Sequence, residues 1–450
     1  MNTPICDFVR DYAARAPLRL HMPGHKGVGP LGVEALDVTE IPGADVLYRP
    51  SGVIAESEAN AAAQFGSGRT VYSTEGSSLC IRAMLYLARL WARERGMAPR
   101  ILAARNAHKA LLSAAALLDL PVDWLFPAEG GVLSCAVDPG ALDGRLADGQ
   151  YAAVYVTSPD YLGNCADLAA LAAVCRARGA LLLVDNAHGA YLRFLTPSRH
   201  PMDLGADLCC DSAHKTLDVL TGGAYLHLAA SAPPTLRDAA DRAMSLFAST
   251  SPSYLILQSL DRMNAALADG YAETVLSTAS RVAALRRTLT AEGWTCVGDE
   301  PLKLTLCPKS RGYTGAELAA LLERRNIFCE FADPDHVVFM FAPSLPARCC
   351  GTLLDGLRAA APREPIPEEP PALSAPRRVL TPREAMLAPA ETMPVDRAAG
   401  RVLASPGVSC PPAVPILLCG EVIDEAAIRA FRYYGIERVD VVKEVCAWKS

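Results

Sequence analysis

The sequence predicts an α/β protein whose mostly parallel β-sheet is sandwiched between helices. The residues at 180–184 form a continuous apolar run, which suits a central strand covered on both faces. Short β-branched or apolar runs alternate with helical patterns between residues 70 and 228, as in other α/β folds. The chain has 450 residues, of which 51% are hydrophobic and 20% charged, so it can bury a large core.

The predicted elements follow one another in a regular order. We expect helices at 7–16, 53–65, 79–95, 110–118 and 166–178, and strands at 70–73, 101–104, 122–126, 152–156, 180–184, 206–210 and 222–228. Further along, long helical patterns at 255–292 precede strands at 302–306 and 337–341, a helix at 315–325 and a helix at 424–434. Because prolines stand at 362, 365, 367, 370, 371 and 376, we expect a linker there.

These patterns suggest five parts of the chain. They are an N-terminal arm with loops at 1–50, a large domain at 51–260, a small α/β domain at 261–360, a proline-rich linker at 361–378 and a C-terminal domain at 379–450.

Composition excludes several classes of function. The net charge of −6 gives no basic footprint for nucleic acid. No apolar stretch is long enough to span a membrane, and the first 19 residues do not resemble a signal peptide. The 15 cysteines form no Cys-x-x-Cys pair, so we expect no metal site and a cytoplasmic protein with reduced thiols.

A lysine follows the strand expected at 206–210, within Ser212-Ala213-His214-Lys215-Thr216-Leu217. Partial burial and a neighbouring cation would lower the pKa of the Lys215 amine and allow it to form a Schiff base. The alternative is a surface loop lysine, since His25-Lys26 and His108-Lys109 repeat the same dipeptide.

Asp185 ends the apolar run at 180–184. Open α/β sheets bind ligands at the carboxyl ends of their strands. An aspartate there can keep a pyridinium nitrogen protonated, as pyridoxal phosphate requires. The alternatives are a helix cap or a metal ligand.

Gly76-Ser77-Ser78 stands between a short strand and a strong helical pattern. Free backbone N–H groups and the helix dipole make such a position a phosphate site, although a serine N-cap is the alternative. His108 follows another strand and could stack on an aromatic cofactor, or be a structural histidine. Combined with Lys215 and Asp185, these residues favour pyridoxal phosphate.

Several segments together resemble the Orn/Lys/Arg decarboxylase family, the pyridoxal-phosphate enzymes of aspartate-aminotransferase-like fold (fold type I). The likeness is strongest to short bacterial forms without an N-terminal receiver-like domain. It covers residues 20–260 in family order, with weaker matches to about residue 425. The matching segments are His21-Met22-Pro23-Gly24-His25-Lys26-Gly27, Thr39-Glu40-Ile41-Pro42-Gly43, Arg105-Asn106-Ala107-His108-Lys109, Thr157-Ser158-Pro159, Val184-Asp185-Asn186-Ala187-His188-Gly189, Ser212-Ala213-His214-Lys215-Thr216-Leu217 and Ser249-Thr250-Ser251-Pro252-Ser253-Tyr254.

The resemblance implies a role for each matching residue. Lys215 would carry the cofactor, Asp185 would pair with its pyridine nitrogen, and Ala187 and His108 would pack on opposite ring faces. His188 would lie near cofactor and substrate. The phosphate would be bound by Gly76, Ser77, Ser78, Ser212 and His214.

The resemblance also implies a reaction: loss of CO₂ from arginine, lysine or ornithine to give a polyamine-type amine. Glu421, in the counterpart of a family Pro-Gly-Glu segment, is the first candidate to bind the basic end of the substrate, although it could be a surface glutamate. Asp160 is the second candidate. The resemblance further implies a homodimer or higher homo-oligomer.

Some positions depart from the usual family residues. Departures include Val46, Tyr48, Glu75, Ala110, Asp160, Asn186, Cys410, Ala413 and Cys419. They leave two alternatives open: another reaction of fold type I, such as that of a transaminase, lyase or racemase, or a degenerate paralogue without activity.

Overall fold

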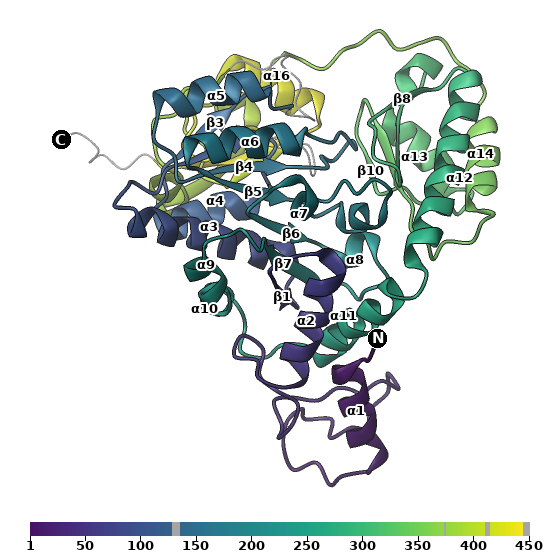
Figure 1. Cartoon of the computed structure of the whole chain (residues 1–450). Helices are drawn as coiled ribbons and strands as arrows, with labels where there is room; N and C mark the ends of the chain where they lie inside the picture. Colours follow the sequence, from purple (N-terminus) through teal and green to yellow (C-terminus); the bar gives the residue numbers. More distant parts are fainter. Residues whose placement is uncertain (128–135, 373–374, 410–414, 444–450) are drawn as a thin grey trace. The chain divides into compact units, whose positions relative to one another are not determined.

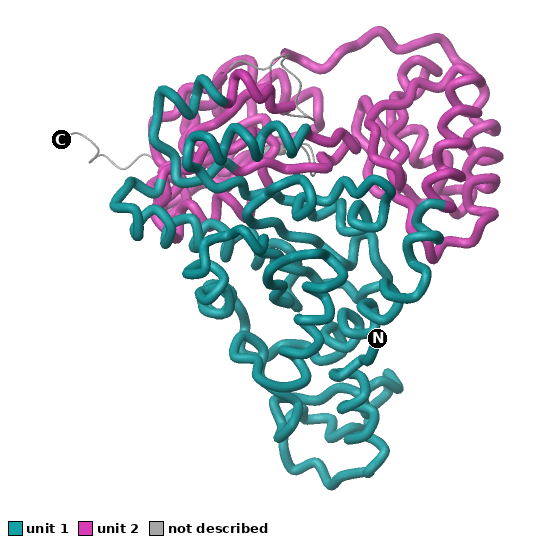
Figure 2. The backbone as a smooth tube through the Cα atoms, in the orientation of Figure 1, with its two compact units in different colours: residues 1–99, 143–154, 167–276 teal, residues 100–142, 155–166, 277–450 magenta. Residues whose placement is uncertain are grey.

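The computed structural model describes residues 1–127, 136–372, 375–409 and 415–443 (Figure 1). Cys410 and Ala413 lie outside the described residues. The chain divides into two compact units (Figure 2). The first comprises residues 1–99, 143–154 and 167–276, and the second comprises residues 100–142, 155–166 and 277–450.

Within the described residues, the largest sheet has seven strands in the order β1-β7-β6-β5-β4-β2-β3. They are β1 (Arg69–Ser73), β2 (Ile101–Ala104), β3 (Val122–Leu125), β4 (Ala153–Thr157), β5 (Leu181–Asp185), β6 (Leu208–Asp211) and β7 (Ala224–Leu228). β2 pairs with β3 and β5 with β6 in parallel, whereas β7 is antiparallel to both β6 and β1. The predicted α/β fold class is confirmed.

The helices up to residue 291 alternate with these strands before forming a longer run. They are α1 (Pro4–Ala14), α2 (Val53–Phe65), α3 (Ser77–Glu94), α4 (Lys109–Leu118), α5 (Pro139–Asp148), α6 (Leu168–Arg178), η1 (Ala190–Phe194), α7 (Pro201–Leu204), α8 (Ala213–Thr216), α9 (Pro234–Asp238), α10 (Ala240–Ser245), α11 (Tyr254–Leu267) and α12 (Tyr271–Ala291). α3 packs on β5, β6 and β7, and α6 packs on β5.

Local chemistry sets the helix ends. The side chain of Asp167 accepts the N–H of Ala170 and caps α6, which stops at Gly179 with a φ of +71°. Every residue of β5 is buried, as expected for a strand that is apolar throughout.

A second sheet has the antiparallel order β10-β11-β9-β8. Its elements are β8 (Thr295–Val297), β9 (Lys303–Cys307), η2 (Pro308–Arg311), α13 (Gly315–Glu323), β10 (Phe331–Ala332), β11 (Val337–Met340) and α14 (Cys349–Arg358). Thr314 and Glu317 form a capping box at the start of α13. The predicted strands at 302–306 and 337–341 and the helix between them are therefore confirmed.

The chain after the proline-rich segment forms two small antiparallel ladders, β12 with β15 and β13 with β14. Its elements are α15 (Pro382–Leu387), β12 (Ala390–Pro394), η3 (Val395–Arg397), β13 (Gly407–Ser409), β14 (Pro415–Leu418), α16 (Glu425–Tyr433) and β15 (Arg438–Val442). Leu403, Ile416, Phe431 and Val441 belong to their shared core. None of the described helices combines the length and apolar composition needed to cross a membrane.

Candidate active site

Lys215 lies in the single-turn helix α8, directly after β6. Its Nζ lies 3.0 Å from Nε2 of His188. His188 is 6% exposed, whereas the Lys215 residue is exposed, so a ligand can reach the amine. An imidazole at this distance can exchange a proton with Nζ.

Asp185 is the last residue of β5 and is 2% exposed. Its Oδ1 accepts the N–H of Ala187 at 3.2 Å. β5 and β6 are parallel and pair Asp185 with Cys210, so Asp185 and the start of the Lys215 segment lie at the same edge of the sheet. The structure thus brings together the predicted nitrogen partner and the segment of the predicted cofactor lysine.

The proposed phosphate site is built around the N-terminus of α3. Gly76 is the N-cap, with a φ of +70°, and its N–H donates to Gly222 O at 2.7 Å. The hydroxyl of Ser212 donates to Ser77 Oγ at 2.8 Å. A Cβ built on Gly76 would lie 3.9 Å from Cε1 of His214, so the imidazole borders the loop.

This donor set fits a phosphate group. The first N–H groups of an α-helix lack intrahelical partners and favour an anion. Ser77 and Ser78 are the first two residues of α3, and no side chain caps this helix, so the alternative of a serine N-cap is wrong. Burial lowers the pKa of His214, and its Nδ1 donates to Gly223 O at 3.0 Å, so the neutral ring borders the phosphate site without a second N–H to donate.

Glu75, a departure from the family pattern, has a partner outside this loop. Glu75 is exposed, and its Oε1 accepts the N–H of Ser249 at 2.7 Å. The negative charge is therefore engaged by the segment at 249–254.

His108 belongs to the second unit and is the N-cap of α4. Its Nδ1 accepts the N–H of Ala110 at 3.2 Å. A backbone donor on Nδ1 leaves the ring proton on Nε2 in the neutral form, so this bond sets both tautomer and ring orientation.

Glu421, also in the second unit, forms a bidentate ion pair with Arg105 at 2.6 and 2.7 Å. Each side chain is 3% exposed, and Glu421 Oε2 also accepts the N–H of Leu418 at 2.7 Å. Arg105 lies over the rings of Trp124 and Phe126. The alternative of a surface glutamate is wrong. Binding of a substrate cation by Glu421 requires an exchange with Arg105.

Asp160 is 3% exposed and follows β4. Its two carboxylate oxygens accept the backbone and side-chain N–H groups of Asn164, both at 2.9 Å. Its carbonyl accepts Lys303 Nζ at 3.1 Å, and Lys303 pairs with Glu300 at 2.8 Å. The loop that carries Asp160 is thus tied to β9.

Comparison with known proteins places the chain in a family. Residues 3–297 match the model of the Orn/Lys/Arg decarboxylase major domain. The chain belongs to the Orn/Lys/Arg decarboxylase family. It is 31% identical to the uncharacterized protein YaaO of Bacillus subtilis over 95% of this chain and 93% of that protein. It is 29% identical to the arginine decarboxylase of the same organism over 95% and 92% of the two chains.

Solved structures show the same fold. The lysine decarboxylase A of Pseudomonas aeruginosa matches with a TM-score of 0.79 and 18% identity, over 98% of this chain and 80% of that one. The constitutive lysine decarboxylase of E. coli matches with a TM-score of 0.78 and 18% identity, over 98% and 82%. Members of the family are pyridoxal-phosphate-dependent decarboxylases of basic amino acids, and this chain is an enzyme of that class.

Sequence reasoning missed one buried carboxylate of this Orn/Lys/Arg decarboxylase. Asp211 ends β6 and has no solvent exposure. The signal was available, because Asp211 follows an apolar run at 206–210 in the way that Asp185 follows its own run.

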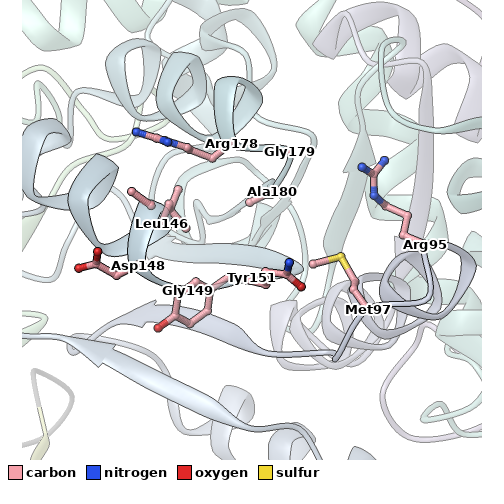
Figure 3. A pocket seen from close by; sticks show the side chains of 11 residues that line it. Arg95, Met97, Leu146, Asp148, Gly149, Tyr151, Arg178, Gly179 and Ala180 are labelled. Atoms are coloured by element: carbon pink, nitrogen blue, oxygen red, sulfur yellow. The ribbon is translucent and has the colours of Figure 1, made fainter.

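The first unit contains a cavity of about 420 Å³ that none of the candidate cofactor residues lines (Figure 3). Tyr151 and Ala180 line it shortly before β4 and β5 begin, so it opens at the amino-terminal edge of these strands. Its arginines are engaged: Arg178 pairs with Asp143 at 2.7 Å, and Arg95 lies over the ring of Trp91. This cavity is therefore separate from the candidate cofactor residues at the strands' carboxyl ends.

Proposed function

We propose that this enzyme decarboxylates arginine and that Lys215 is the residue that binds pyridoxal phosphate covalently. The observation that carries the lysine assignment is the 3.0 Å contact between Lys215 Nζ and His188 at the carboxyl edge of β5 and β6. Arginine is proposed because relatives that are 27–29% identical over 93–96% of this chain are named arginine decarboxylases.

Pyridoxal phosphate, once bound, accepts the electrons released when the bond from Cα to the carboxylate breaks. The residues of this chain bind and orient the cofactor and move the proton. Asp185 keeps the pyridine nitrogen protonated through its buried carboxylate. Ser77, Ser78 and Ser212 donate to the phosphate. Gly76 and His214 shape the loop around it, because the Gly76 N–H and His214 Nδ1 already donate to Gly222 O and Gly223 O. His188 moves a proton at Nζ of Lys215.

Two further residues complete the cofactor site in this proposal. Ala187 would pack on one face of the cofactor ring, and its N–H is held by Asp185. His108 would stack on the other face, and the bond from Ala110 sets the orientation of its ring.

The distal guanidinium of arginine needs a carboxylate. Asp160 already accepts one hydrogen bond on each oxygen, which leaves lone pairs for another donor. Glu421 is neutralised by Arg105, so a substrate cation gains less there unless Arg105 moves. On this ground Asp160 is the stronger candidate. Asp160→Asn should raise KM for arginine with little change in the affinity for pyridoxal phosphate.

The proposal is tested by measuring CO₂ and amine release from the cofactor-loaded protein with arginine, lysine and ornithine in parallel. We expect release from arginine, with loss of release in Lys215→Ala. Release from lysine or ornithine alone would correct the substrate. Formation of a keto acid or a D-amino acid in place of CO₂ would contradict decarboxylation itself.

We further propose that the enzyme acts as a homodimer. The N-terminal arm exposes Leu18, Leu20, Met22, Val28 and Leu31, which are 66–84% exposed. Such a group of apolar side chains is typical of a protein contact surface.

A further inference from the structure

A buried polar cluster surrounds the carboxylate of Asp211 in the first unit. Oδ1 accepts Nδ2 of Asn186 at 2.7 Å, and Oδ2 accepts Nε2 of His200 at 2.9 Å. Nε2 of His227 lies 3.3 Å from the same Oδ2. All four side chains have no solvent exposure. Polar groups buried so completely stabilise a structure only when they are paired.

The hydrogen-bond pattern fixes the ring of His200. Its Nδ1 accepts the N–H of Met202 at 3.3 Å, so in the neutral ring the proton sits on Nε2 and points at Asp211. Although burial would raise the pKa of Asp211, the contacts with His200 and His227 hold it far below its usual range. Asp211 is therefore an anion held by donors.

Potential ligand atoms of His200, Cys209 and Asp211 lie within 4.8 Å of one another. In this structure Nε2 of His200 is engaged by Oδ2 of Asp211 at 2.9 Å, so the cluster is held together by its own hydrogen bonds.

Asn186 connects this cluster to the cofactor residues. It directly follows Asp185, and its N–H donates to Cys210 O at 3.0 Å while its side chain donates to Asp211. The end of β5 is thus joined to the end of β6 through both main chain and side chain. Asp211 in turn directly precedes Ser212 and the Lys215 segment.

The turn after Asn186 closes around its side chain. The N–H of Gly189 donates to Asn186 O at 2.8 Å, and a Cβ built on Gly189 would lie 2.0 Å from Asn186 Oδ1. This turn carries His188, the residue in contact with Lys215 Nζ. Asn186 therefore sets the position of Asp185, which precedes it, and of His188, two residues further along the turn.

We propose that Asp211 is a positioning residue of the cofactor site. Its carboxylate holds Asn186 and His200, and through Asn186 it fixes Asp185 and His188 against the segment of Lys215. This inference rests on the proposed function, since it assumes that Lys215 and Asp185 bind the cofactor.

An exchange of acid and amide tests the proposal. Asp211→Asn leaves one of the donors from Asn186 or His200 without an acceptor, and Asn186→Asp places two carboxylates together. We expect each variant to weaken binding of pyridoxal phosphate on the order of tenfold or more. The double variant Asn186→Asp/Asp211→Asn places the carboxylate at position 186 and the amide at position 211. It restores one donor and one acceptor, and should recover most of the lost cofactor affinity.

The readouts are the dissociation constant of pyridoxal phosphate by equilibrium dialysis and the fraction of protein labelled at Lys215 after borohydride reduction. Asp207→Asn is the matched control, because Asp207 joins the opposite ends of the same strands by accepting the N–H of Leu182 at 2.8 Å. It should lower thermal stability without changing cofactor affinity. If Asp211→Asn does not fold, Asn186→Ala replaces it, since this variant leaves Asp211 paired with His200.

The positioning role would be overturned if the single variants bound pyridoxal phosphate as tightly as the wild-type protein. It would also be overturned if the loss of affinity in the double variant equalled the sum of the losses in the two single variants. Absence of cofactor attachment to Lys215 in the wild-type protein would instead overturn the proposed function. The two failures are therefore distinguishable.

Discussion

Arg105 and Glu421 show how a single pair of residues can link segments far apart in the chain. Arg105 follows β2, and Glu421 follows β14. Removing one partner of a buried pair leaves an uncompensated charge, whereas replacing both with apolar groups is often tolerated.

We predict that Glu421→Gln lowers the free energy of unfolding by about 3–5 kcal/mol. Urea unfolding monitored by circular dichroism measures this change. The matched control is Arg105→Met/Glu421→Met, which should recover much of the loss. An unchanged unfolding midpoint in Glu421→Gln would show that the pair contributes little to stability.

The hydroxyl of Ser212 is a second case in which one atom can be tested. Ser212→Ala removes the donor to Ser77 and, in our proposal, a phosphate contact. We expect cofactor affinity to fall by roughly 10- to 150-fold, since one hydrogen bond to a charged group contributes about 1.5–3 kcal/mol. Ser245→Ala serves as control, because the exposed Ser245 donates its hydroxyl to Arg242 O within α10. Equal cofactor affinity in the two variants would remove Ser212 from the phosphate site.

At the scale of elements, the turn between β10 and β11 holds a histidine beside a buried aspartate. Nδ1 of His336 lies 3.4 Å from Oδ1 of Asp333. Burial lowers the pKa of His336, but the interactions with Asp333 and Cys307 outweigh it and raise the pKa to about 9.

A raised pKa in the folded state has a definite consequence for stability. The protonated ring stabilises the fold fully below its unfolded-state pKa of about 6.5, and this contribution is lost as pH rises through about 9. We predict that the free energy of unfolding declines between pH 6.5 and 9.5, and that His336→Gln flattens this decline. A wild-type pH profile indistinguishable from that of His336→Gln would contradict the charged state of the ring.

Elements differ in how well the sequence alone predicts them. β5 was predictable because Leu181–Val184 are apolar and end at a charged residue. The pair β12 and β15 was not predicted, because it joins Ala390–Pro394 to Arg438–Val442 across almost fifty residues and no local pattern encodes such a pairing. Helix α5 was also missed, since Gly140 and Gly144 weaken its helical pattern.

The residues of the candidate site also divide into those that a local sequence pattern predicts and those that only the fold brings together. Lys215, Asp185 and Ser77 could be predicted because each stands at the end of a recognisable strand or the start of a helix. The partners of Glu421 and Asp211 could not, because Arg105 and His200 are brought to them only by the fold.

At the scale of the whole molecule, the exposed N-terminal arm predicts self-association. Leu20→Glu/Val28→Glu places two charges among the exposed apolar side chains, and desolvating charges at an interface is unfavourable. We expect light scattering to show dimers for the wild-type protein and monomers for this variant. Phe328→Glu, at an exposed phenylalanine of the second unit, is the control and should remain dimeric. A dimer that survives both arm substitutions would place the interface elsewhere.

The most direct test of the account is to locate the cofactor on the chain. The protein is purified with pyridoxal phosphate, reduced with borohydride, digested and analysed by mass spectrometry. We predict a single modified peptide with the phosphopyridoxyl group on Lys215, and no such peptide in Lys215→Ala. Modification of another lysine, such as Lys26 or Lys109, with Lys215 unmodified would contradict the central assignment and the site built around it.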